Sequence, residues 1–233
     1  MTPVPAVVTL HIWRVHPRAV LAAAAHIALD RRAVRHSPHL TFAKLLGTGR
    51  GATFGARDAN PTRWAMLACW SDTAGPDAFD ASAVGQAWGR RAIERSRIEL
   101  QPLSSRGRWS GHEPFGRPAG GDPDGPVAVL TRARLRTGRS PAFYRAVPPV
   151  AAALHASAGV RLAIGVGEAP IGLQGTFSVW DSAAAVRAFA YADPAHAAVV
   201  ERTPAERWYA EELFTRFAVL RARGSVDGKD LMS

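Results

Sequence analysis

Five features of the first half of the chain return, in the same order, in the second half. The matching pairs are Val7–Leu10 with Val127–Leu130, Lys44–Gly49 with Leu162–Gly167, Met66–Asp72 with Thr176–Ser182, Trp70 and Phe79 with Trp180 and Phe189, and Arg106–Gly107 with Arg223–Gly224. Five matches in one order indicate an internal duplication. A duplication constrains the fold more strongly than any single motif does.

Each copy has the pattern strand, helix, strand, strand, helix, strand. In the segment 6–15, apolar Val8, Leu10 and Ile12 alternate with other residues, which is the period-two signature of a strand. A helix is expected after Pro17 in the first copy and from Ser140 in the second, because proline suits the first turn of a helix. The other expected strands are Leu40–Leu46, Arg63–Trp70, Val160–Val166 and Leu173–Trp180, with a helical region after each of the tryptophans at 70 and 180 and a closing strand in each copy.

The βαββαβ order is that of a ferredoxin-like unit, whose sheet has helices on one face only. Two such sheets placed face to face bury the remaining apolar faces. The sequence therefore predicts an α+β fold in which tandem ferredoxin-like βαββαβ repeats form a dimeric-type α+β barrel within one chain. The expected divisions are a first repeat at 1–110, a linker at 111–126, a second repeat at 127–224 and a tail at 225–233. The space between the sheets is either a ligand cavity or a packed core.

The formal net charge of +10 raises the question of nucleic-acid binding. Almost all of the positive charge is arginine that is spread along the chain, and no known nucleic-acid-binding motif accompanies it, so we expect no nucleic-acid partner. Attraction to an anionic membrane surface needs no such motif. No apolar run is long enough to span a membrane and no secretory signal is visible, so we expect a cytoplasmic protein that can associate peripherally with membranes.

Several segments resemble a known family, the spheroidene monooxygenases of carotenoid biosynthesis. In the first half these are Phe42–Gly51, Asn60–Trp64 and Trp70. In the second half they are Leu130–Ala133, Ile164–Pro170, Thr176–Trp180 and Trp208–Phe217, and the resemblance extends over Val7–Gly224.

The resemblance implies an oxidoreductase that introduces a keto group at C2 of acyclic carotenoids such as spheroidene. It also implies haem b as the cofactor, dioxygen as a co-substrate and an external electron donor such as ferredoxin. The expected barrel architecture agrees with the one deduced from the repeat. The substrate would be an apolar small molecule; the sequence does not predict the oligomeric state.

His196 is the expected axial ligand of the haem iron. In Asp193-Pro194-Ala195-His196, the aspartate would cap a helix and place the histidine in its first turn, where the helix dipole disfavours imidazole protonation. A neutral imidazole can bind iron. The resemblance places a histidine in this segment, and the first copy has Gln86 at the matching position, so the haem site is expected in the second copy. The alternative is a surface histidine.

Three further residues are candidates near the haem. A helix expected from Thr203 would contain Trp208 and Arg216. Arg216 would bind a haem propionate or pair with Glu212 on the same helix. Trp208 would be part of the cofactor wall or of the core. His11 is the second choice of iron ligand, and the alternative is that it is a histidine of the core. Cys69 could also bind the iron, but we expect it to be a buried cysteine that packs as a small apolar residue.

Glycines at 47, 49, 51, 165 and 167 do not form a dinucleotide fingerprint and are expected to turn the chain at hairpin ends. Two other functions stay open. One is a haem enzyme of another reaction type, dehydration or nitrogen chemistry on a smaller molecule. The other is a cofactor-free protein that binds a small ligand.

Overall fold

The computed structural model describes residues 2–52, 58–136, 140–168, 173–192 and 208–232. The first half contains β1 (Val7–Val15), the short helix η1 (Pro17–Ala19), α1 (Val20–Leu29), α2 (Arg31–Arg35), β2 (Leu40–Gly49), β3 (Ala59–Trp70), α3 (Gly75–Ala81), α4 (Ala83–Arg91) and β4 (Ala92–Gly107). The second half contains β5 (Val127–Leu135), α5 (Ser140–Ala156), β6 (Val160–Gly167), β7 (Leu173–Trp180), α6 (Ala183–Ala192) and β8 (Tyr209–Gly224).

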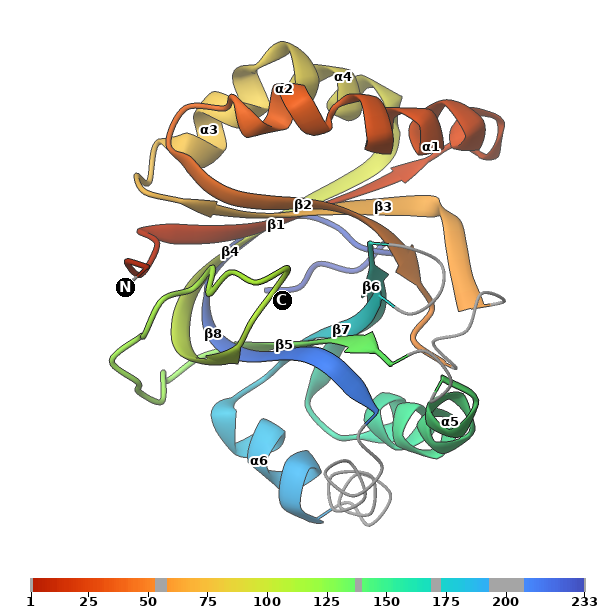
Figure 1. The fold of residues 1–233 in the computed structure, drawn as a ribbon, viewed down its shortest axis with the longest axis vertical. Helices are drawn as coiled ribbons and strands as arrows, with labels where there is room; N and C mark the ends of the chain where they lie inside the picture. Colours follow the sequence, from red (N-terminus) through yellow and green to blue (C-terminus); the bar gives the residue numbers. More distant parts are fainter. Residues whose placement is uncertain (1, 53–57, 137–139, 169–172, 193–207, 233) are drawn as a thin grey trace.

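The eight strands form one closed antiparallel barrel in the order β1-β3-β2-β6-β7-β5-β8-β4. The first-half strands occupy one side of the barrel and the second-half strands the other, with the same internal order in each half. In Figure 1, α1–α4 cover the first-half strands and α5 and α6 cover the second-half strands on the opposite side. The α+β class, the strands and the helices after Trp70 and Trp180 are confirmed.

The strand β8 corrects one prediction. The capping signals at Thr203 and Glu206 lie outside the described residues. We expected the helix to continue as far as Arg216 and a closing strand to follow it, but the whole of Tyr209–Gly224 is a strand. Its burial alternates: Leu213, Thr215 and Phe217 point inward and the residues between them are more exposed. This period of two buries an apolar face against β4 and β5, and tertiary packing of this kind overrides local helix signals.

The barrel interior is a packed core. Apolar side chains from both halves meet there, among them Leu10, Leu67, Leu130 and Phe177, each at most 1% exposed. The segment 111–126 contains no helix or strand, and it contributes Phe115 to this core. Of the two possibilities for the space between the sheets, the described residues therefore support packing.

Two tight turns close the ends of the strands. In the turn Trp109–His112, Ser110 and Gly111 have positive φ, and in the turn Val226–Lys229, Asp227 and Gly228 do. Trp109 and Val226 insert into the barrel core. The carboxylate of Glu211 accepts hydrogen bonds from the N–H groups of Ser110 and Gly111, and that of Glu94 accepts one from the N–H of Gly228.

A cluster of charges holds the first of these turns. Arg132 donates to Glu211 and Glu168, and Lys44 lies 2.7 Å from the Glu168 carboxylate. Burial alone would raise the pKa of Glu168, but the hydrogen bonds from Lys44, Trp109 and Arg132 outweigh it and hold the pKa below its usual value.

No described helix combines the length and apolar character needed to cross a lipid bilayer.

Gly107→Ala is expected to destabilise the fold strongly. Gly107 has a φ of 90°, and a Cβ there would lie 2.1 Å from the Glu212 carbonyl oxygen of the paired strand. The backbone of one strand would have to move, at a cost of more than about 3 kcal/mol. Gly111→Ala is the matched control, because Gly111 has a φ of 78° with nothing within 4 Å of the added atom. The control should cost roughly 1–2 kcal/mol. Urea unfolding of both variants measures the difference, and equal losses would contradict the close approach.

Candidate functional site

The two halves of the barrel meet at two places, a long pairing of β4 with β8 and a short junction between β2 and β6. The junction consists of three residue pairs, Gly47–Gly167, Thr48–Val166 and Gly49–Gly165. The expectation that these glycines turn the chain is therefore wrong for the four paired ones, which lie within strands. Their φ values are not positive, whereas that of Gly51 is 79°. What the glycines supply is a sheet surface without side chains.

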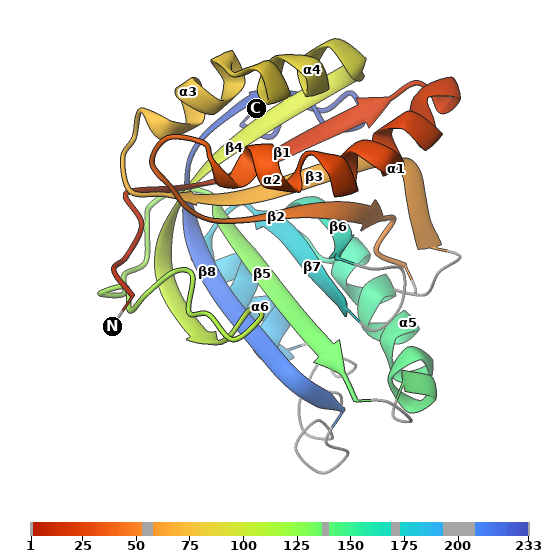
Figure 2. The same cartoon turned by 45° about the horizontal axis from the view of Figure 1, so that its top comes forward.

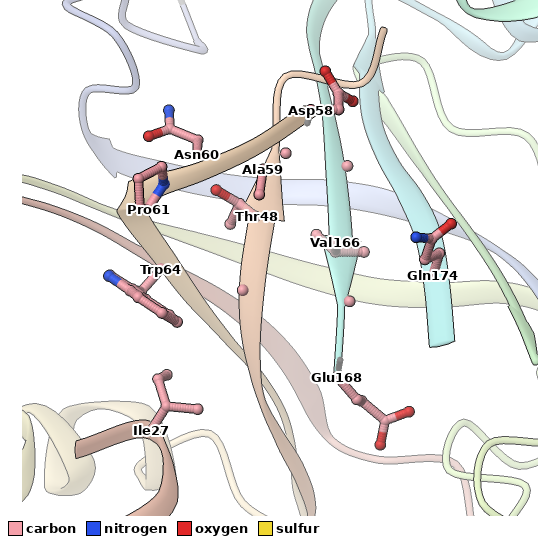
Figure 3. Close-up of a pocket in the computed structure, with 14 residues that line it drawn as sticks. Ile27, Thr48, Asp58, Ala59, Asn60, Pro61, Trp64, Val166, Glu168 and Gln174 are labelled. Carbon is pink, nitrogen blue, oxygen red and sulfur yellow. The ribbon is translucent and has the colours of Figure 1, made fainter. Parts of the chain in front are cut away.

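A pocket lies over this junction, and we call it the seam pocket (Figure 3). Its volume is about 320 Å³, near the lower end of the range for small-molecule sites. Besides the junction residues, its lining comprises Ile27, Asp58, Ala59, Asn60, Pro61, Trp64, Glu168 and Gln174. Figure 3 shows Ile27 and Trp64 on one side of the paired strands and Glu168 and Gln174 on the other. The lining is mostly apolar, with polar groups at its edges.

The pocket opens on the helix-facing side of the sheet. Side chains alternate along a strand, and Ala163 of β6 packs with the helix-facing cluster of the second half, so Gly165 and Gly167 face the same way. On β7, Phe177 and Val179 point into the barrel, so Gln174 faces the helices. The seam pocket therefore adjoins the helix-facing side of the second half.

The helix-facing sides of the two halves can be compared position by position. Val7 pairs with Trp70, and Val127 pairs with Trp180. This register makes Thr131 the counterpart of His11, and Ala133 the counterpart of Trp13.

The first half fills its helix-facing side with aromatic rings. His11 stacks on Trp13 and meets the edge of Phe79 with centroid distances of 5.6 and 5.2 Å. Trp13 also stacks on Trp88 of α4 at 5.0 Å. His11 and Trp13 are 2% and 4% exposed, so little space remains between this sheet and its helices.

The second half lacks these rings at the matching positions. Thr131 stands where the first half has His11, and it is exposed in the middle of an interior strand. Ala133 replaces Trp13, and Gln174 replaces Trp64. Thr131 is exposed, and Ala133 is buried but short, so this part of the sheet face has no aromatic ring and a flat ligand could lie against it at Thr131.

Of the predicted site residues, His196 lies outside the described residues. Trp208 is fully buried next to the start of β8. Arg216 lies on β8, on the same side as Phe214, and donates from Nε to the Ser104 hydroxyl at 3.3 Å. The predicted pairing with Glu212 assumed a helix and is wrong; the acidic partner of Arg216 is Asp122, 3.6 Å away.

Asp122 is shared between two arginines. Arg187 of α6 also donates to its carboxylate, so two guanidinium groups face one carboxylate. The net positive charge lies at the edge of the helix-facing side of the second half. An anionic group of a ligand could bind there.

His11 and Cys69 lie away from this face. Burial and the charge of Arg97 lower the pKa of His11 to about 3, so its imidazole is neutral at ordinary pH. Its Nε2 is buried and has no hydrogen-bond partner among the described residues. Cys69 belongs to the barrel core, and burial raises the pKa of its thiol. Within the described ranges, no group of three or more histidine, cysteine or acidic residues could hold a metal ion.

Sequence reasoning missed most of the polar groups around the seam pocket. Glu168 and Gln174 lie near the ends of neighbouring strands and gave no motif, and Asp58 follows a segment without periodicity. Their proximity depends on the β2–β6 junction, which joins residues more than 100 positions apart. The paired glycines were the available signal, because glycine inside a strand often marks a place where a ligand or another chain approaches.

Comparison with known proteins gives three close relatives, while no protein-family model matches the chain. The chain is 37% identical over 207 residues to spheroidene monooxygenase of Rhodobacter capsulatus, covering 87% of this chain and 85% of that protein. It is 39% identical over 194 residues to spheroidene monooxygenase of Rubrivivax gelatinosus, covering 82% and 73%. It is 33% identical over 227 residues to spheroidene monooxygenase of Cereibacter sphaeroides, covering 96% and 69%.

Solved structures share the fold at low identity. A crystal structure of aldoxime dehydratase has a TM-score of 0.59 at 11% identity, covering 91% of this chain and 80% of that one. A second aldoxime dehydratase, crystallised with butyraldoxime, has a TM-score of 0.55 at 11% identity, covering 91% and 79%. At this identity the likeness concerns the fold alone.

His11→Phe is expected to remove part of the acid sensitivity of folding. The unfolded chain takes up a proton at His11 below about pH 6.5, but the folded protein does not until about pH 3. Stability contributed by the neutral imidazole is therefore complete above pH 6.5 and falls as the pH drops towards 3. Between pH 7.5 and 5.0 the free energy of unfolding of the parent should fall by about 2 kcal/mol because of His11. The variant lacks this imidazole and should not show that part of the decrease.

Urea unfolding at the two pH values measures this difference. Phenylalanine keeps a ring between Trp13 and Phe79, so packing changes little. Titration of His11 near pH 6.5 in an NMR experiment would contradict the prediction.

Proposed function

The chain belongs to the spheroidene monooxygenase family, and on this premise we propose that it is a haem-dependent monooxygenase that introduces a keto group at C2 of an acyclic carotenoid such as spheroidene. The proposed location of the haem site rests on one observation. On the helix-facing side of the second half, Thr131 and Ala133 stand in place of His11 and Trp13. The proposed cofactor is haem b, and the proposed electron donor is a protein such as ferredoxin.

The chemistry of a monooxygenase sets what the protein must provide. One oxygen atom of O₂ enters the substrate and the other leaves as water, with two electrons and two protons supplied from outside. Two successive oxidations of one methylene carbon, followed by loss of water, give a ketone. When bound, haem supplies the iron at which dioxygen is activated. The protein must bind the reactants, orient them and exclude bulk water.

The residues of the second half fit a haem. A flat apolar ring can lie against a sheet face whose side chains are short, as they are at Thr131 and Ala133. Arg216 and Arg187 share one carboxylate, that of Asp122, so the group has a net positive charge. A haem propionate could pair with this charge. His196 remains the proposed axial ligand, and Trp208 is proposed as part of the wall. His11 remains the second choice, although it is enclosed by Trp13 and Phe79 on the other half.

The seam pocket is the proposed binding site for part of the substrate. It is mostly apolar, and it adjoins the helix-facing side of the second half through β6 and β7. A pocket of about 320 Å³ holds a segment of a long polyene while the rest extends beyond it. The net charge of +10 complements an acidic electron donor and would speed its encounter with the protein.

We also infer that the two halves are tandem copies of one ferredoxin-like unit. They share the strand order, the positions of Trp70 and Trp180 opposite the first strand, and the pair of turns at Trp109–His112 and Val226–Lys229. This duplication explains how one copy could keep its aromatic filling while the other lost it.

Haem binding is the first test of the proposal. The protein, expressed with a haem supply, should show a Soret band, and His196→Ala should lose most of it. Thr131→Trp should also prevent haem uptake, because it places a large ring on the proposed binding face. Absorption spectra and haemin titrations measure both effects.

The controls separate this site from others. Thr131→Val conserves the volume and should bind haem normally, as should His11→Phe and Cys69→Ala. Added imidazole should partly restore the band of His196→Ala, because the missing side chain leaves a space of that shape. Normal haem uptake by Thr131→Trp would contradict the location, and the absence of any Soret band would contradict haem dependence.

Turnover is the second test. The haem-loaded protein, an acyclic carotenoid, dioxygen and a reduced ferredoxin system should yield a ketocarotenoid that carries one atom from ¹⁸O₂. Mass spectrometry of the product measures the label, with water exchange at the ketone checked in parallel. Conversion without a donor, or no conversion of any carotenoid, would contradict the monooxygenase proposal and leave another haem reaction as the alternative.

A cofactor-free ligand-binding protein is the second candidate. The packed barrel interior favours it, because the described residues fill the space between the sheets with apolar side chains. A protein of this kind would show no haem spectrum. It would bind an apolar molecule reversibly at the seam pocket. The spectra described above distinguish it from the first proposal.

A further inference from the structure

Helix α1 is apolar almost throughout and yet lies open to solvent. Its sequence, Val20–Leu29, contains no polar residue except His26. Ala23 is its only buried residue. Leu21 and Leu29 are 85% and 70% exposed. In Figures 1 and 2, α1 lies at the outside of the first-half helical layer.

The exposed side of α1 is uniform. Leu21, Ala25 and Leu29 follow one another at intervals of four residues and therefore share one side of the helix. Ala22, Ala24 and Ala28 flank them, and all six residues are exposed. A helix that faces only water has charged or polar residues on this side. An exposed side made of alanine and leucine marks an interaction surface.

Arginines surround this apolar side. Arg18 precedes α1, and Arg31, Arg32 and Arg35 follow it on α2; all four are exposed. The first 57 residues contain eight arginines or lysines and one acidic residue, Asp30.

Asp30 does not offset this charge at the surface. Its carboxylate accepts the indole N–H of Trp88 at 3.0 Å, and its other oxygen lies 3.1 Å from the Nδ1 atom of His26. The surface therefore combines an apolar helix with positive charge at both ends. That combination is complementary to an anionic bilayer, where apolar side chains enter the acyl boundary and arginines meet phosphate groups.

The same helix contributes to the seam pocket. Ile27 is partly buried, faces away from the exposed side and lines the pocket opposite Glu168 and Gln174 (Figure 3). A bilayer in contact with α1 would therefore lie close to the pocket.

We propose that α1 and its flanking arginines dock the protein onto an anionic lipid bilayer, and that the seam pocket receives its apolar ligand from that bilayer. The proposal of docking rests on the exposure of α1 and on the arginines that flank it. The delivery of a ligand rests on the proposed function.

Vesicle binding tests the docking. The protein should co-sediment with vesicles of phosphatidylcholine and phosphatidylglycerol, and less with phosphatidylcholine alone. Leu21→Glu combined with Leu29→Glu should lower the partition coefficient at least about tenfold, because two apolar anchors become charges. Leu220→Glu is the matched control: Leu220 is 53% exposed on β8, far along the chain from α1, and its variant should bind normally.

Charge variants test the electrostatic part. Arg31→Gln and Arg32→Gln should each weaken binding about fivefold, and added salt should reduce these differences. Equal vesicle binding by the parent and the double leucine variant would overturn the proposal, and so would no binding by the parent.

Analytical ultracentrifugation tests the other occupant, a second copy of the chain. We expect the parent and the double leucine variant to have the same oligomeric mass in solution. A parent dimer that the double variant converts to a monomer would assign α1 to self-association and overturn the proposal. The haem spectrum of the double variant should equal that of the parent, so a failure of docking is distinguishable from a failure of the proposed function.

Discussion

Each half of this protein has a sheet with helices on one face, and the other face is apolar and must be buried. Closing the eight strands into one barrel buries both faces against each other. The resulting core includes Trp109, Phe115, Val226 and Leu231 from the segments that follow β4 and β8, so even the chain ends of the two units are used for packing. The described residues fill this core with side chains, and the seam pocket lies instead at the junction of β2 and β6.

The two helix-facing sides have the same strand order but different contents. In the first half, His11, Trp13 and Trp88 form a continuous stack that fixes α3 and α4 on the sheet. In the second half their counterparts are Thr131, which is exposed, and Ala133, which is buried but short. A stack of rings stabilises a fold, whereas short side chains at the same positions give up that packing and create room. This difference is the reason for proposing the haem site in the second half.

The sequence predicted the strands well because apolar residues alternate along them, as Val8, Leu10 and Ile12 do in β1, and because Trp70 and Trp180 repeat. In the structure β1 is buried on both faces. Sequence reasoning failed at the first part of β8, where a helix start signal upstream was extended as far as Arg216, although the alternation of Leu213, Thr215 and Phe217 signals a strand. It also misjudged Gly47, Gly49, Gly165 and Gly167. Their role depends on the pairing of β2 with β6, a contact between distant segments that no local pattern encodes.

The charge cluster of Arg132, Glu168 and Glu211 could not be foreseen for the same reason, since it depends on how β6, β7, β5 and β8, which are distant in sequence, lie side by side in the sheet. His196 was proposed from local signals and a resemblance, and its segment lies outside the described residues. The location of the haem is therefore the central claim, and crystals of the haem-loaded protein test it most directly through the anomalous diffraction of iron. The account predicts one iron peak on the helix-facing side of β5 and β7, next to Thr131. A peak within the barrel, or one on the β1 side next to His11, would contradict it.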